Sequence, residues 1–298
     1  MNEFVLDHRV IEGLRDVADD YDVILCDVWG VVHNGVRAFR RATEALASFR
    51  ARGGATVLIT NAPRPARPII RQLDDFGVPR SAYDAVVTSG DVTLALMHER
   101  AGAPVHHIGP SRDLALFDEL HTAALAPPAR VPLDAAAYVV CTGLFDDEAE
   151  TPEDYEALLE EMGSRGLAMI CANPDLVVHR GEQLLHCAGA LAARFEEKGG
   201  VVIYAGKPHA PIYEKALDEA ALLRGGPVAR SRVLAIGDAM RTDIAGAAAF
   251  GIDALFVTRG IHREELHGED GSLDPRRYGV FAAKVRHRPV AAISELVW

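Results

Sequence analysis

Four polar residues, widely separated along the chain, each follow a short apolar run. Asp27 follows VILC, Thr60 follows VLI, Lys207 follows YAG and Asp238 follows LAIG. In an open α/β sheet, the carboxyl ends of neighbouring parallel strands lie along one edge, where ligands bind. Carboxylates, a hydroxyl and an ammonium that lie far apart in the sequence could therefore share one crevice. The pattern predicts a ligand-binding site at this edge of the sheet.

The segments around these residues alternate between strand-like and helix-like patterns. Apolar runs at 23–27, 55–60 and 84–90 are separated by amphipathic segments, and the same texture returns from residue 201 onward. Such alternation predicts a parallel sheet covered by helices and joined by right-handed crossovers. The final segment, AAISELVW at 291–298, is expected to dock as a last helix.

The composition of the sequence changes in the middle of the chain. Connections that contain glycine and proline separate further strand-like segments there, such as VHHIG, AYVVCTG and LAMICANP. We expect residues 1–101 and 201–298 to form a Rossmann-like, doubly wound α/β core. Residues 102–200 are expected to form an inserted α/β module with its own small core.

Composition narrows the class of protein. The 298 residues carry a formal charge of −12, which argues against broad binding to nucleic acid or anionic membranes. The four cysteines lie far apart without zinc-site spacing and are interpreted as reduced thiols. No apolar run approaches the ~18 residues that span a bilayer, and the N-terminus lacks the basic start of a signal peptide. We expect a cytoplasmic protein without nucleic-acid or membrane partners; its oligomeric state is open, with a homodimer as one alternative.

Together, the four motifs resemble those of the haloacid dehalogenase-like hydrolase superfamily. ILCDVWGVV, VLITNA, YAGKP and IGDAMRTD stand in the order of that family's nucleophilic Asp, Thr or Ser, Lys and acidic motif. The spacing is closest to subclass IIA, the 4-nitrophenylphosphatase-like and sugar-phosphatase-like branch, whose C2-type cap lies between the second and third motifs. ICANPDLVV at 170–178 is similar to a segment of that cap. The resemblance covers nearly the whole chain and implies an α/β core with an inserted α/β cap.

The resemblance also implies a role for each motif residue. Asp27 would be the nucleophile, Thr60 would hydrogen-bond the transferring phosphoryl group, and Lys207 would neutralise negative charge. The implied ligands of Mg²⁺, an ion that takes oxygen donors, are Asp27, Asp238, Asp243 and the main-chain carbonyl of Trp29. The implied substrate-binding residues are Thr60, Asn61, Asn173, Asp175 and Lys207. For Asn173 and Asp175, a simple proline turn is an equal alternative.

Residue 29 departs from the family pattern. Phosphatases of this superfamily usually carry a second Asp two residues after the nucleophile, where it protonates the leaving alcohol. Here the residue is Trp29, whose indole N–H donates hydrogen bonds but has no useful acidity at neutral pH. Because general acid–base catalysis contributes about 10² to 10⁴-fold, ordinary alkyl phosphates should be hydrolysed slowly unless another group substitutes.

Three interpretations of Trp29 stay open. His33, six residues after Asp27, could supply the proton, because histidine titrates in the right range. Alternatively, the leaving group needs no protonation, as in an acyl phosphate, an aryl phosphate or a carbon leaving group of the phosphonatase type. In the third interpretation, the site binds a phosphorylated ligand and turns it over little.

The sequence thus predicts a Mg²⁺-dependent hydrolase that acts on a small phosphorylated metabolite through an aspartyl-phosphate at Asp27. The main rival is a catalytically impaired protein of the same fold that only binds such a metabolite. A nucleotide-binding dehydrogenase is disfavoured, because no GxGxxG follows the first predicted strand.

Overall fold

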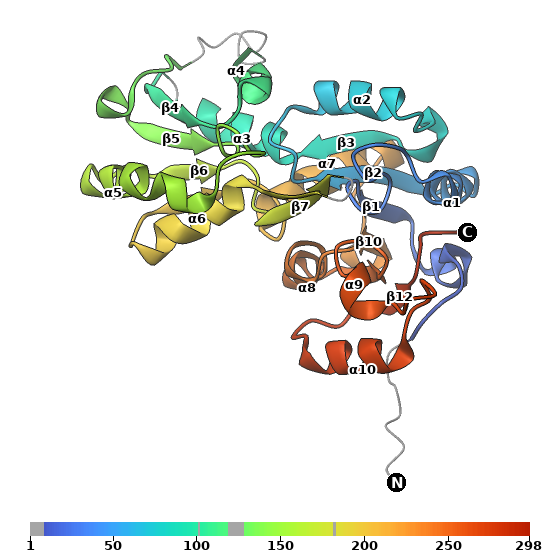
Figure 1. The fold of residues 1–298 in the computed structure, drawn as a ribbon. Helices are drawn as coiled ribbons and strands as arrows, with labels where there is room; N and C mark the ends of the chain where they lie inside the picture. The colour runs from blue at the N-terminus through green and yellow to red at the C-terminus, as the bar shows by residue number, and fades with distance from the viewer. Residues whose placement is uncertain (1–8, 101, 119–127, 181–182) are drawn as a thin grey trace. The chain divides into compact units, whose positions relative to one another are not determined.

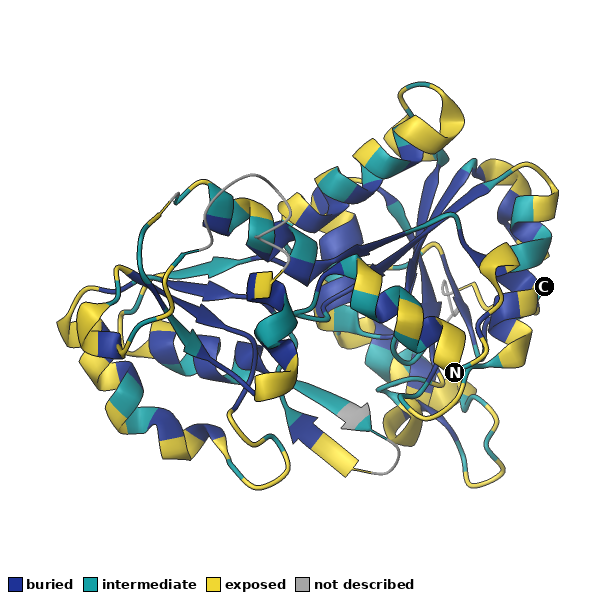
Figure 2. Cartoon of the chain, turned by 90° about the horizontal axis from the view of Figure 1, so that it is seen from above, coloured by how far each residue is buried: buried dark blue, intermediate teal, exposed yellow. Residues whose placement is uncertain are grey.

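The computed structural model describes residues 9–100, 102–118, 128–180 and 183–298 (Figure 1). The chain divides into two compact units. The first comprises Met1–Ile59, Leu73–Val86 and Tyr213–Trp298, and the second comprises Thr60–Gln72 and Val87–Ile212. In both, the strands are largely buried, whereas the helices alternate between buried and exposed residues (Figure 2).

One sheet has six strands in the order β12-β11-β10-β1-β2-β3. The strands are β1 Val23–Asp27, β2 Ala55–Thr60, β3 Ala85–Thr88, β10 Val233–Gly237, β11 Asp253–Val257 and β12 Ala291–Ile293. Neighbouring pairs from β12 to β2 are parallel. Every residue of β1 and β10 is buried, as expected for strands covered on both faces. The chain adds strands to one side of β1 and later to the other, so the strand order reverses between β1 and β10.

The helices between and after these strands follow the predicted alternation along the chain. They are α1 Arg40–Ala51, α2 Ala66–Asp75, α3 Ser89–His98, α7 Ala210–Arg224, α8 Ala245–Phe250, α9 Arg263–Leu266 and α10 Pro275–Lys284. Of these, α3 lies in the second unit. In α1, Ala42, Leu46 and Phe49 are buried at helical spacing and turn one stripe toward the core. The predicted α/β class with a doubly wound parallel sheet is confirmed.

A second sheet lies within the second unit and has the order β4-β5-β6-β9, with every neighbouring pair parallel. Its strands are β4 Val105–Ile108, β5 Tyr138–Cys141, β6 Met169–Cys171 and β9 Val202–Tyr204. The helices α4 Ala115–Asp118, α5 Glu156–Ser164 and α6 Ala188–Glu197 belong to the same unit. Buried side chains such as Leu159, Leu191 and Phe195 form its own core.

Three local features differ from the sequence-based expectations. The helix predicted for 291–298 is wrong: β12 pairs with β11 there, and its three residues are buried. β9, which was expected in the segment that returns to the core, pairs with β6 instead. An antiparallel hairpin of β7 Val177–Arg180 and β8 Gln183–His186 was not predicted. The division into a core of 1–101 and 201–298 and a cap of 102–200 stays a prediction.

Candidate active site

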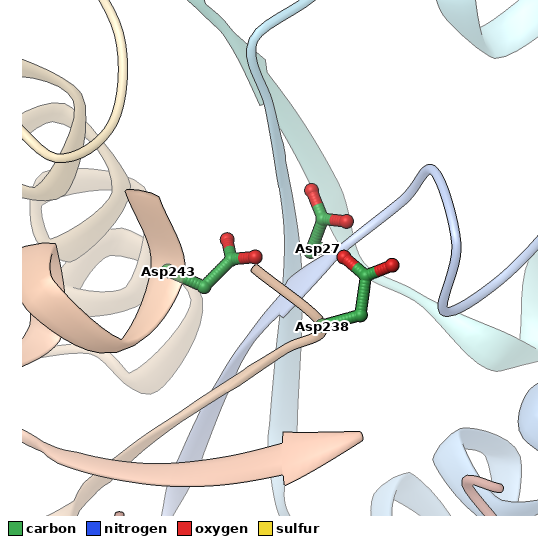
Figure 3. Close-up of side chains that lie close together, drawn as sticks. All are labelled: Asp27, Asp238 and Asp243. Atoms are coloured by element: carbon green, nitrogen blue, oxygen red, sulfur yellow. The ribbon is translucent and has the colours of Figure 1, made fainter. Parts of the chain in front are cut away.

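Three carboxylates converge at the carboxyl ends of β1 and β10 (Figure 3). Asp27 is the last residue of β1, Asp238 follows β10, and Asp243 lies in the π-helical turn Met240–Ile244 that leads into α8. One carboxylate oxygen from each residue lies within 4.8 Å of the others. The three residues are only 4–6% exposed. They occupy the point where the strand order reverses, which is the usual ligand-binding crevice of a doubly wound sheet.

Electrostatics makes this cluster a good fit for a divalent cation. Two unit charges about 4 Å apart repel by about 4 kcal/mol at an effective dielectric constant near 20. Three buried carboxylates this close therefore disfavour one another unless positive charge lies between them. Carboxylate oxygens are the donors that Mg²⁺ and Ca²⁺ take. The donor set and its burial thus match the predicted metal site.

Close approach of two glycines fixes the Asp238 carboxylate. A Cβ atom at Gly30 would lie 2.1 Å from Asp238 Oδ2, and one at Gly260 would lie 1.9 Å from the same oxygen. The Ile261 N–H donates a 2.8 Å hydrogen bond to that oxygen. Gly30 also has a φ of +88°, a conformation that favours glycine. Sequence reasoning missed both roles, because neither glycine belongs to a phosphate-binding pattern.

Asp243 is held in a similar way by its own loop. The Ala239 N–H donates to Asp243 Oδ2 at 3.1 Å, and a Cβ at Gly237 would lie 2.2 Å from Asp243 Cβ. The Tyr213 hydroxyl lies 3.3 Å from the Asp243 carbonyl oxygen. These contacts orient the first turn before α8 and support the predicted placement of Asp243 beside Asp238.

The loop after β1 folds onto itself around Trp29. The indole lies against Gly35, where a Cβ atom would sit 2.5 Å from Trp29 Cζ2. Its ring meets that of His33 edge-on, with centroids 5.2 Å apart, and His33 meets Phe76 in the same way at 4.9 Å. The Gly30 N–H donates to the His33 carbonyl oxygen at 2.8 Å. The two aromatic side chains therefore hold the turn that carries Gly30.

The surroundings of His33 do not support its predicted role as a proton donor. The residue is 2% exposed, and burial lowers the pKa of its imidazole to about 4. Its Nδ1 accepts a 2.9 Å hydrogen bond from the Gly35 N–H, so the proton of the neutral ring is on Nε2. A buried neutral imidazole stabilises the loop, and the catalytic role stays a prediction.

A second group of predicted residues meets within the second unit. The Asn61 amide oxygen accepts the Lys207 N–H at 2.8 Å, and its nitrogen donates to the Lys207 carbonyl oxygen at 3.1 Å and to Asp175 Oδ1 at 2.9 Å. The Asp175 N–H donates to Asn173 Oδ1 at 3.1 Å. Asn61 and Lys207 are 3% and 2% exposed. The structure thus joins Asn61, Asn173, Asp175 and Lys207 in one hydrogen-bonded group.

Thr60 and Ser89 belong to the same unit as this group. Thr60 ends β2 directly after Ile59, the register partner of Asp27, and its hydroxyl oxygen accepts the Ala62 N–H at 3.2 Å. The Ser89 hydroxyl lies 2.9 Å from the Ala62 carbonyl and 2.5 Å from the Ala172 carbonyl. Ser89 was missed by the sequence reasoning, because only the fold reveals that its hydroxyl lies between two loops.

Comparison with known proteins defines the class. Residues 24–123 match the family model of a haloacid dehalogenase-like hydrolase, and residues 204–278 match a HAD-hydrolase-like model. A hydrolase of the haloacid dehalogenase-like family from Brucella suis is 47% identical, with a TM-score of 0.84 over 97% of this chain and 100% of that chain. The chain belongs to the haloacid dehalogenase-like hydrolases, as the four motifs predicted.

Two further proteins that resemble this chain are phosphatases. A D-glycerol 3-phosphate phosphatase of Mycobacterium tuberculosis is 28% identical over 251 residues, which are 84% of this chain and 66% of that protein. A 4-nitrophenylphosphatase from Thermotoga maritima shares the fold at 21% identity, with a TM-score of 0.68 over 94% of this chain and 96% of that chain. The predicted subclass IIA likeness is thereby confirmed.

No helix in the described ranges has the length and apolar character needed to cross a membrane.

Proposed function

We propose that this hydrolase is a Mg²⁺-dependent phosphatase that uses Asp27 as its nucleophile on a small phosphorylated metabolite. The observation that carries the proposal is the convergence of three buried carboxylates at the switch point of the sheet. The similarity to phosphatases of small phosphorylated compounds supports the substrate class.

Each residue has a defined part in the proposed reaction. Asp27, Asp238, Asp243 and the Trp29 carbonyl would hold the cation, which offsets repulsion between Asp27 and the phosphate. An Asp27 oxygen attacks phosphorus, the bond from phosphorus to the leaving group breaks, and an aspartyl-phosphate forms. Water then cleaves this intermediate and releases inorganic phosphate. Thr60 and Lys207 would contact the phosphoryl group throughout.

The residues around Trp29 restrict the leaving group in this proposal. The indole is not an acid at neutral pH, and His33 is buried with its Nδ1 already accepting a hydrogen bond. The leaving group must therefore depart without a proton from either side chain. Acyl and aryl phosphates meet this requirement, because their leaving groups are stable as anions.

Hydrolysis of substituted phenyl phosphates with Mg²⁺ tests the proposal. We expect kcat/KM to fall steeply as the pKa of the leaving phenol rises, and alkyl phosphates to be slower by about 10²-fold or more. Trp29→Asp should flatten this dependence by supplying an acid. If the wild type turns over every compound no faster than Asp27→Asn does, the proposed catalytic activity is refuted. If kcat/KM of the wild type does not depend on the pKa of the leaving phenol, the proposed limit on leaving groups is refuted.

The second candidate, a protein that binds a phosphorylated metabolite without turning it over, is favoured by Trp29 alone. Calorimetry with inorganic phosphate and Mg²⁺ would then show binding, while no phosphate ester is hydrolysed. A cytoplasmic location, the absence of nucleic-acid and membrane partners, and a homodimer stay predictions from the sequence.

A further inference from the structure

Asn61 has a buried side-chain amide whose hydrogen-bonding capacity is almost entirely used inside the chain. An amide group offers two N–H donors and one carbonyl acceptor. Both donors of Asn61 are engaged, one by the Lys207 carbonyl oxygen and one by Asp175 Oδ1. The acceptor receives the Lys207 N–H. The amide thus forms a two-way bridge with the Lys207 main chain, 146 residues away in sequence.

We propose that Asn61 is a positioning residue, which fixes the Lys207 main chain and the Asp175 carboxylate, in place of the substrate-binding role implied by resemblance. The inference rests on the proposed function only in the role given to Lys207. With both N–H groups engaged, Asn61 has no further donor for a phosphate oxygen. Its effect on the reaction is therefore transmitted through Lys207.

Packing around the amide shows that the bridge is built into the fold. A Cβ at Gly206 would lie 2.3 Å from Asn61 Oδ1, 2.8 Å from Pro174 Cδ and 3.0 Å from Ser89 Cβ. Only a residue without a side chain lets these loops approach so closely. Leaving a buried donor or acceptor unpaired costs about 1–3 kcal/mol, so the amide strongly favours this one arrangement.

The arrangement matters because a lysine side chain is long and flexible. Its ammonium stabilises transferring charge well only when the main chain that carries it is held in place. A misplacement of about 1 Å can lower a rate by about 10²-fold. Fixing Lys207 at both its N–H and its carbonyl is thus a direct means of placing the ammonium.

Amide-to-carboxylate exchange gives a sharp kinetic test. Asn61→Asp keeps the shape and the acceptor for the Lys207 N–H, but it removes both donors and sets a carboxylate against Asp175. We expect kcat on an aryl phosphate to fall by about 10 to 100-fold, with a smaller change in KM. The exposed Gln183→Glu in β8 makes the same amide-to-carboxylate change outside the Asn61 group and should leave kcat unaltered.

A reciprocal exchange separates positioning from a loss of folding. In Asn61→Asp combined with Asp175→Asn, the new amide can donate to the new carboxylate and restore that hydrogen bond with reversed polarity. We expect kcat of this double variant to be about tenfold higher than that of Asn61→Asp alone. Losses that simply multiply, as for independent sites, would overturn the proposal.

Hydrogen exchange at the Lys207 amide provides a readout that needs no turnover. The Lys207 N–H should exchange slowly in the wild type and in Asn61→Asp, and at least about tenfold faster in Asn61→Ala, which lacks the acceptor. Unchanged exchange in Asn61→Ala would overturn the positioning role. Faster exchange in a protein that hydrolyses no phosphate ester would support positioning and refute the phosphatase.

Discussion

The carboxylate cluster of the first unit and the Asn61 group of the second differ in what their buried polar atoms face. Asp27, Asp238 and Asp243 place three like charges within 4.8 Å, whereas Asn61 places two donors and one acceptor against complementary atoms. A buried amide that is fully paired is stable as it stands. Buried carboxylates that face one another are stabilised by nearby positive charge, and the proposed Mg²⁺ would add such charge here. We infer from this comparison that the first region is suited to a bound cation, whereas the second is held by its own hydrogen bonds.

Replacing Asp27, the proposed nucleophile, should give the largest effect. Asp27→Asn is expected to lower kcat on an aryl phosphate by about 10³-fold or more, because the amide cannot attack phosphorus. The same variant should melt at a higher temperature than the wild type without metal, because one of three repelling charges is gone. Calorimetry in EDTA checks this second outcome. A lower melting temperature would show that repulsion does not dominate the cluster.

Crowding Asp238 should weaken metal binding. Gly260→Ala would place a methyl group 1.9 Å from Asp238 Oδ2 in the present geometry, so the carboxylate must move. We expect the Kd for Mg²⁺ to rise by about 10 to 100-fold, as for changes that misorient a ligand. Gly226→Ala is the matched control, because a Cβ there meets nothing within 4 Å. An unchanged Kd in Gly260→Ala would mean that Asp238 is not a ligand.

Mg²⁺ should stabilise the protein through the carboxylate cluster and should not change the contribution of Ser89, which lies beside the Asn61 group. Mg²⁺ at about 100 times its Kd should stabilise the wild type by about 2.7 kcal/mol. Ser89→Ala removes a buried hydroxyl that lies between Ala62 and Ala172, and we expect a loss of about 1–2 kcal/mol. Because both hydrogen-bond partners of this hydroxyl are main-chain carbonyl oxygens, that loss should be equal in EDTA and in Mg²⁺. Denaturant titrations under both conditions measure it, and a loss seen only with Mg²⁺ would contradict the distinction.

The two regions also differ in how far the sequence predicts them. Asp27 and Asp238 were identified because each ends a fully apolar run, a pattern that depends only on neighbouring residues. The bridge from Asn61 to Lys207 spans 146 residues, and the approach of Gly260 to Asp238 depends on where a distant loop folds. Such contacts leave no periodicity in the sequence. A parallel α/β fold and its carboxylates are thus predictable, whereas the contacts that position them are not.

Strand assignment failed for the same physical reason. Ala291–Ile293 is a run of three small or apolar residues, too short for a period of 2 or 3.6 to be distinguished. Its conformation is decided by pairing with β11, a long-range interaction that favours an extended chain over the expected helix. Likewise, β9 resembles the other strands in composition, and only its pairing with β6 shows which sheet it joins.

The last prediction compares two buried histidines, His33 in the first unit and His107 in the second. Burial lowers the pKa of each to about 4, so the folded state holds both rings neutral while the unfolded state takes up protons near pH 6.5. Each histidine therefore contributes stability that is complete above pH 6.5 and is lost as the pH falls from there toward 4. By pH 5 the loss should be about 1–2 kcal/mol per histidine. His33→Asn and His107→Asn, measured by urea unfolding at pH 7 and pH 5, should each lose less stability on acidification than the wild type. If His33→Asn alone keeps the wild-type dependence, the His33 ring is accessible to protons in the folded state, and its predicted role as the acid for the leaving group is strengthened.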